Sequence, residues 1–335
     1  MAIIPLRSPR YEILTAPATS NSAKLELSID STLRYTIIKD CTAGSTVTFE
    51  ISELCRDYIE PRLWDLSNSV FTTLSKIDID RDIKFYTGAN GTGTQVGSTN
   101  SASYDGFDGY GDYIDGANFE IPEGATNAFL MSKLDGNYEV FYPETFPSNI
   151  SIWLEVLDSS EQKAQLQYTS GTEIVHRSST ATVNRFDCKK YDPTLIYFVN
   201  KFGAIQQLWF TSKEVEILNT TQESYQRNTI DTSTTTASYF RPTYSTYPTN
   251  PHPIKTYEKN GKKRYQISSG YYPERANVFF EELLLSEYVW INKDLKAIPV
   301  TVVTSNFTYK TSLNDKLIEY TIEFEEAFDH INNIR

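Results

Sequence analysis

The chain has 335 residues and a formal net charge of -12, which argues against a nucleic-acid partner because phosphate binding needs clustered Lys and Arg. With 23 Tyr and 18 Phe but only 2 Met and 3 His, the composition favours strands and wet protein interfaces over helix bundles. The length predicts two or three domains.

Residues 1–86 have the pattern of a β-rich module with one short helix. Ala23–Ile29 alternates, with its leucines and isoleucine on one face, which is typical of a half-buried strand. Apolar residues then recur with helical spacing from Ile51 to Ile59, where Ser52 is a suitable N-cap and Pro61 lies just past the end.

Residues 87–118 break this pattern with Gly, Ser, Asn and Asp. A structureless stretch of this length inside a compact domain is usually functional or disordered. We predict an adaptable contact loop, because tyrosine and glycine together supply aromatic area and backbone freedom. Its candidate contact residues are Tyr104, Phe107, Tyr110 and Tyr113. Two alternatives stay open: a solvated loop without a partner, and a Ca²⁺ site from Asp105, Asp108, Asp112 and Asp115, whose spacing fits no calcium-loop template.

Residues 119–220 predict a second, β-sandwich-like domain. Asp135-Gly136 is a hairpin-turn dipeptide, and Ser170-Gly171 separates two further candidate strands. Three strand-like runs from Thr194 to Leu218 then have the pattern of a meander. Short strands at this regular spacing indicate a sandwich or barrel rather than a βαβ fold.

Residues 221–253 have the composition of a linker, since a run rich in Thr and Pro cannot pack a core of its own. Its tyrosines suggest that the linker lies along a protein surface. The candidate contact residues here are Tyr239, Tyr244 and Tyr247.

Residues 254–335 predict a C-terminal α+β module. Asn260-Gly261 is the strongest short hairpin signal in the chain, and a short helix is expected around Phe280. Ile298–Tyr309 and Lys316–Phe324 then have the pattern of a closing hairpin, the second strand alternating strictly. A terminal helix is expected to follow and to act as a docking element, either on its own domain or on a neighbouring subunit. Its candidate contact residues are Phe324, Phe328 and Ile331.

The sequence contains no motif of a known hydrolase, nucleotide-binding loop or metal site. The three histidines lie far apart, and the adjacent Glu281 and Glu282 point different ways on a helix, so they form a poor acid/base pair. The three cysteines have no metal-ligand spacing and are expected to be reduced thiols. We therefore expect no enzyme activity, no catalytic residues, no cofactor and no metal. The N-terminus has no signal-peptide pattern, and no apolar run is long enough to span a bilayer, so neither secretion nor membrane insertion is expected.

Four segments together resemble virion structural proteins of tailed phages that infect Bacteroidota, the flavobacterial and crAss-like groups. These segments are LRYTIIKD…TVTFEISELCRDYIEP (Leu33–Pro61), YDPTLIYFVNKFGAIQQLWF (Tyr191–Phe210), NVFFEELLLSEYVWI (Asn277–Ile291) and NDKLIEYTIEFEEAFDHINNIR (Asn314–Arg335). The resemblance covers about a third of the chain and transfers no active-site residue. It implies a mainly β chain with tandem β-sandwich (fibronectin/Ig-like) domains, of the kind found in tails, tail tips or necks.

The resulting expectation is a non-enzymatic tail, tail-tip/baseplate or neck subunit of a phage virion. Made in the host cytoplasm, it would contact copies of itself and other virion proteins in a symmetric assembly. One alternative is a module that binds a host surface receptor or glycan, through the tyrosine loop or through Trp64, Trp153 or Trp209. The other alternative is a tail-associated hydrolase, which lacks support from any convergent set of reactive residues.

Overall fold

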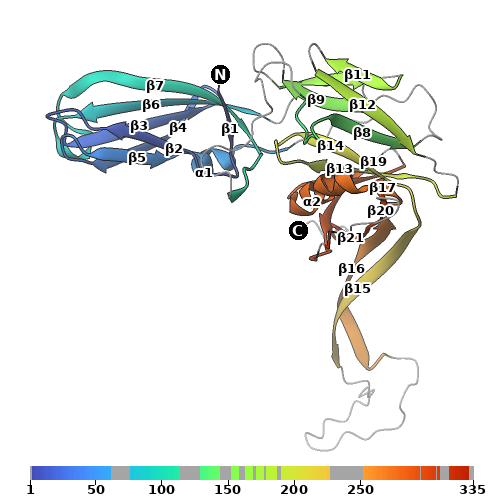
Figure 1. Ribbon diagram of the computed structural model, residues 1–335. Coiled ribbons are helices and arrows are strands. Elements are labelled where there is room, and N and C mark those ends of the chain that lie inside the picture. Colours follow the sequence, from blue (N-terminus) through green and yellow to red (C-terminus); the bar gives the residue numbers. More distant parts are fainter. Residues whose placement is uncertain are drawn as a thin grey trace, which may run out of the picture.

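A computed structural model describes residues 2–61, 76–113, 129–143, 152–157, 163–168, 171–176, 179–186, 190–226, 252–294, 296–306, 308–309 and 317–331. The protein is mainly β, as predicted, with few helices. Three parts are visible in Figure 1: an N-terminal unit (residues 2–107), a larger body, and a two-stranded ribbon that projects away from the body.

The N-terminal unit packs two sheets and a short helix around one core. Its larger sheet has the order β1-β7-β6-β3-β4, and its smaller sheet pairs β2 with β5. The elements are β1 (Ala2–Pro5), β2 (Tyr11–Thr15), β3 (Ser22–Ile29), β4 (Thr32–Asp40), β5 (Thr46–Glu50), α1 (Ser52–Arg56), β6 (Ile77–Tyr86), η1 (Ala89–Gly91) and β7 (Gln95–Phe107). The alternation predicted for β3 is confirmed, since Leu25, Leu27 and Ile29 are all buried. The predicted helix forms as the single turn of α1, although its N-cap is Ile51 and not Ser52.

The prediction of a long contact loop at residues 87–118 is wrong over much of that range. Residues Gln95–Phe107 form β7, which pairs antiparallel with β6 and parallel with β1. The first nine residues of β7 are half-buried or exposed. This part of the strand therefore lacks the apolar alternation from which a strand can be predicted. Its partners on both sides supply the backbone hydrogen bonds that a polar strand still needs.

The body is built on a seven-stranded sheet of order β14-β13-β18-β19-β21-β16-β15. Smaller sheets, β11-β12-β8, β10-β9 and β17-β20, surround it. The elements are β8 (Tyr138–Pro143), β9 (Ile152–Leu157), β10 (Lys163–Tyr168), β11 (Glu173–His176), β12 (Ser179–Phe186), β13 (Thr194–Val199), β14 (Ile205–Phe210), β15 (Glu214–Gln226), β16 (Ile254–Ser268), β17 (Tyr272–Pro273), η3 (Glu274–Ala276), α2 (Asn277–Leu285), β18 (Val289–Lys293), β19 (Lys296–Val302), β20 (Leu317–Ile318) and β21 (Thr321–Glu326).

This sheet runs across the predicted boundary between a second domain and a C-terminal module. β13 and β14 form the predicted hairpin, but β15 lies at the opposite edge of the sheet and pairs with β16. The expected meander and the expected decoupling at 221–253 are therefore both wrong. The pattern of a strand predicts which face it buries but not which distant strand it pairs with.

Of the turns predicted in the body from short dipeptide motifs, some form and others do not. Asp135 and Gly136 both have positive φ and close the turn between Leu134 and Asn137, as predicted. Asn260 and Gly261 instead lie within the unbroken β16, where they face Thr221 and Thr220 of β15. The strands flanking Ser170-Gly171 also pair with other partners, β10 with β9 and β11 with β12.

Aromatic side chains fill the core of the body between α2 and the large sheet. Phe280 of α2 is fully buried, and its ring meets those of Phe210, Tyr272 and Tyr320 with centroids 5.1–6.2 Å apart. The helix predicted here is thus confirmed as α2. The closing hairpin is confirmed as β19 and β21, and the predicted apolar face of residues 318–324 is buried.

The N-terminal unit joins the body through close backbone contacts. The Tyr110 backbone N–H donates to the Lys201 carbonyl at 2.9 Å, and the Arg56 guanidinium lies 2.6 Å from a Glu287 carboxylate oxygen. Gly203 has φ +69°, and a Cβ there would lie 2.8 Å from the backbone of Asp108. Only glycine fits this turn without displacing the neighbouring chain, so the junction has a defined geometry.

Candidate functional site

The tyrosine-rich segment does not form one contact surface. Tyr104 is buried and its hydroxyl donates to Glu12 Oε1 at 2.8 Å, while Phe107 is buried in a small cluster at the junction. Tyr110 is half-buried beneath the guanidinium of Arg7, which lies 4.9 Å from its ring centroid. Tyr113 alone of these four candidates is fully exposed.

The aspartates proposed as a calcium alternative do not converge. Asp105 is fully buried and accepts a hydrogen bond from the Lys76 amine at 3.1 Å, whereas Asp112 accepts one from the Lys201 amine at 2.7 Å. Asp115 lies outside the described residues. Within the described part of the chain, no group of three or more acidic, His or Cys side chains could hold a metal ion.

The candidate contact residues near the C-terminus also differ in exposure. Phe324 is fully buried in the core of the body, so it is not a contact residue. Phe328 and Ile331 are exposed, but residues 327–331 form bends and not the predicted helix. Glu325 and Glu326, where that helix was expected to begin, extend β21 and pair with β19 and β16, which removes them from a helix. Tyr239, Tyr244 and Tyr247 lie outside the described residues.

The most exposed feature is the projecting ribbon, here called the arm: residues 215–226 of β15 and 254–263 of β16 (Figure 1). The whole of β15 from Val215 to Gln226 is exposed, so neither face of the strand packs against a core. The same holds for residues 254–259 of β16. A single two-stranded ribbon is at best marginally stable in water. Contact with another molecule would stabilise the arm by covering its exposed faces.

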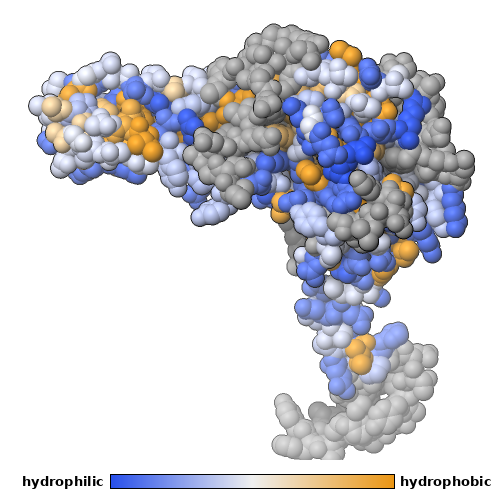
Figure 2. All heavy atoms as spheres, viewed as in Figure 1, coloured by the Kyte–Doolittle hydropathy of each residue, from blue (hydrophilic) through white to orange (hydrophobic). Residues whose placement is uncertain are grey.

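The arm carries apolar and aromatic side chains although no core covers it. Near its far end, the rings of Tyr225 and Tyr257 meet with centroids 6.1 Å apart, and both side chains are about half exposed. Leu218 and Ile254 are also exposed. Figure 2 shows a mostly hydrophilic arm with a hydrophobic spot near its far end. Sequence reasoning missed this surface because it placed a short hairpin at Asn260-Gly261 and a linker from 221 onward.

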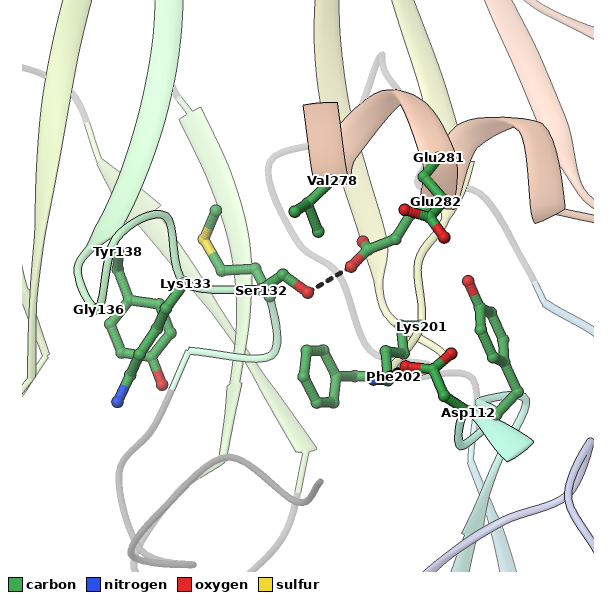
Figure 3. A pocket seen from close by; sticks show the side chains of 12 residues that line it. Asp112, Ser132, Lys133, Gly136, Tyr138, Lys201, Phe202, Val278, Glu281 and Glu282 are labelled. Carbon is green, nitrogen blue, oxygen red and sulfur yellow. Dashed lines mark hydrogen bonds and ion pairs between the residues drawn. The ribbon is translucent and has the colours of Figure 1, made fainter. Parts of the chain in front are cut away.

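A second feature is a pocket of about 620 Å³, here called the junction pocket, where the residues that follow β7 meet the body (Figure 3). It is lined by Tyr110, Asp112, Met131, Ser132, Lys133, Gly136, Tyr138, Lys201, Phe202, Val278, Glu281 and Glu282. Three aromatic rings together with carboxylate, amine and hydroxyl groups give this pocket flat apolar surfaces beside hydrogen-bonding groups. Such a mixture suits a small ligand with several hydroxyl groups.

Glu282 is the one buried carboxyl group of this pocket's lining. It lies on α2, three residues after Phe279, and accepts a hydrogen bond from the Ser132 hydroxyl (Figure 3). Burial raises the pKa of Glu282 from 4.5 to about 7, against the opposing effects of the Ser132 hydroxyl and of Lys201. The sequence contained a signal for this burial, because a residue three positions after an apolar one shares its helix face.

Glu281 and Glu282 both line this pocket but differ in burial and in hydrogen-bond partner. Glu281 is half-buried and accepts a hydrogen bond from the Tyr309 hydroxyl at 2.7 Å, so the two carboxylates have separate partners. Of the tryptophans considered for glycan contact, Trp209 is buried, Trp153 is half-buried and Trp64 lies outside the described residues. A buried ring cannot stack on a sugar, which excludes Trp209 from that role.

No protein-family model, curated protein or solved structure matches this chain. Among the residues that the structure describes, none of the helices combines the length and the apolar character needed to cross a bilayer.

Proposed function

We propose that the chain is a non-enzymatic structural subunit of a phage virion, in the tail, tail tip or neck, and acts through protein–protein interfaces. The observation that carries this proposal is the arm, which exposes both faces of Val215–Gln226 and of residues 254–259 together with an aromatic pair. Native proteins normally cover, shorten or charge such strands, because open strand edges pair with other chains. An arm of this kind is typical of a subunit whose partner completes it.

The four segments that resemble tailed-phage virion proteins support the same role. The two sheets of the N-terminal unit, packed on one core, are consistent with a sandwich of the fibronectin/Ig-like kind. The partners are then copies of the chain and other virion proteins, and the protein is found in the particle after synthesis in the host cytoplasm.

Hydrogen exchange tests this role directly. In isolated protein the amides of Val215–Gln226 should exchange fast, because the ribbon has no core, whereas assembled virions should protect them. The control is Leu25–Ile29 in β3, which is paired on both sides and should be protected in both samples. Absence of the chain from purified virions, or equal exchange of the arm in both samples, would contradict the proposal.

A second candidate function is glycan binding at the junction pocket. The polar and aromatic lining of this pocket favours it, and the exposed carboxylate of Asp112 is one of its lining groups. Calorimetric titration with host surface polysaccharide should then show binding that Asp112→Ala weakens and that Asp192→Ala, an exposed aspartate outside the pocket lining, leaves unchanged. Equal heats for both variants would exclude this site.

A further inference from the structure

One carboxyl oxygen in the lining of the junction pocket is buried without a hydrogen-bond partner. Glu282 is 2% exposed, and it accepts the Ser132 hydroxyl on Oε1. The Lys201 backbone also acts on this carboxyl group and favours its charged form, yet Glu282 Oε2 has no hydrogen bond among the described residues. A buried polar atom without a partner costs free energy, which a donor group of a ligand in the pocket would recover.

The cations of this pocket are engaged with other groups. Lys201 is the cation that acts on Glu282, but its amine lies 2.7 Å from a carboxylate oxygen of Asp112. The Lys133 amine lies 5.2 Å from the centroid of the Tyr138 ring. Within the described part of the chain, no lysine or arginine therefore forms an ion pair with Glu282.

The other charged or titratable groups near Glu282 do not supply a positive charge to it. Glu281, its neighbour on α2, raises the pKa of Glu282 and accepts the Tyr309 hydroxyl at 2.7 Å. Burial raises the pKa of Tyr110, so this phenol is uncharged at neutral pH. The Arg7 guanidinium is placed 4.9 Å from the centroid of the Tyr110 ring. A cationic donor entering the pocket would thus find its counter-charge at Glu282.

The shape of the junction pocket suits a small organic molecule. Its volume of about 620 Å³ is in the range of small-molecule sites. Val278 and Phe202 supply apolar walls, and in Figure 3 they lie above and below the hydrogen bond between Ser132 and Glu282. Because the carboxyl group is screened from water, an ion pair formed with it would be stronger than one at the surface.

We propose that the junction pocket binds a small ligand through a primary ammonium group, which donates a hydrogen bond to Glu282 Oε2. This inference rests on the second candidate function, a ligand in the junction pocket, and names the charged group that the ligand carries. An amino sugar and a simple organic amine share this chemistry. Without a ligand the folded protein keeps a proton on Glu282 up to about pH 7, so the ammonium binds as that proton leaves to the buffer.

Calorimetric titration of the full-length protein with glucosamine, phenethylamine and glucose tests this proposal. At pH 7 at least one of the two amines should bind, and glucose should bind at least about tenfold more weakly because it has no charge for Glu282. The amine should bind about fivefold more weakly at pH 6 than at pH 7, since less of Glu282 is ionised. Titrations at pH 6 in two buffers of different ionisation enthalpy should show release of about one proton for each amine bound.

The variant Glu282→Gln keeps the shape of the side chain and removes its charge. It should weaken amine binding at pH 7 at least about tenfold and abolish the proton release. Glu53→Gln, at an exposed position outside the pocket lining, should bind the amine as the wild type does. Binding of glucosamine alone assigns an amino sugar, and binding of phenethylamine alone assigns an amine without hydroxyl groups.

Three results would overturn the proposal: no binding of either amine, glucose binding as tightly as the amines, or amine binding that Glu282→Gln leaves unchanged. If host polysaccharide nevertheless binds and Asp112→Ala weakens it, glycan binding at the pocket stands without an ammonium group. If an amine binds through Glu282 and the polysaccharide does not, the ammonium site stands and glycan binding is refuted.

Discussion

Replacing Glu282 with glutamine should stabilise the protein above pH 7 and remove a pH dependence of its stability. The folded state holds the Glu282 proton with a pKa of about 7, against 4.5 for the exposed group. The contribution of Glu282 to stability is therefore largest below pH 4.5, falls as the pH rises between the two values, and is about 3 kcal/mol smaller above pH 7. Glutamine keeps an oxygen for the Ser132 hydroxyl and carries no charge to bury.

Urea unfolding at several pH values between 4 and 8 measures this effect. The midpoint of Glu282→Gln minus that of the wild type should rise across the range, because only the wild type loses the contribution of this group. Glu53→Gln, at an exposed position in the first turn of α1, should follow the wild type. Parallel curves for the wild type and Glu282→Gln would show that this carboxyl group does not titrate in the range. The groups that face Glu282, namely Ser132, Lys201 and Glu281, are unchanged in this comparison.

Phe324→Ala should destabilise the protein by about 3–5 kcal/mol, because it removes a fully buried ring from the core of the body. The Phe324 ring lies with its centroid 6.0 Å from that of Phe210, so the substitution leaves a cavity beside other large side chains. Thermal and urea unfolding should both report the loss.

Phe328→Ala is the matched control, since the same side chain is removed four residues later at a position that is 44% exposed. Its cost should stay within about 0.5 kcal/mol in the isolated protein. Similar losses for both variants would mean that residues 327–331 pack on the body more tightly than their exposure indicates. The pair therefore separates the core role of Phe324 from any contact role of Phe328.

Local sequence patterns correctly predicted the features that depend on neighbouring residues, namely the buried face of a strand and one tight turn. The alternation from Ile318 to Phe324 predicted the buried face, and Asp135-Gly136 predicted its turn, because side-chain period and positive φ are properties of neighbouring residues. Pairing between distant strands could not be predicted in this way. The polar β7 has a place in the sheet because β6 and β1 flank it, and Asn260-Gly261 stays extended because β15 pairs along its whole length.

Two of the candidate contact residues are buried for the same reason. Tyr104 lies in a segment that looked exposed, and Phe324 lies where the alternating strand meets the predicted terminal helix. The N-terminal core buries Tyr104, and the core of the body buries Phe324. The sequence did not predict the arm, because its two strands have the composition of an ordinary strand and of a linker. Only the structure shows that no other layer covers them.

The arm is also a mechanical connection, since β16 runs without a break from the far end of the arm into the core. A pull along the arm reaches the body as shear between β16 and β21, which pair from Arg264 to Ser268. The bonds across this pairing lie side by side and share the load, and the ion pair of Arg264 with Glu325 at 2.9 Å adds to them. The hydroxyl of Tyr265 donates to Glu326 at 2.8 Å inside the core. An arm anchored in this way resists detachment by sliding, so tension applied along the arm would be carried by the large sheet of the body.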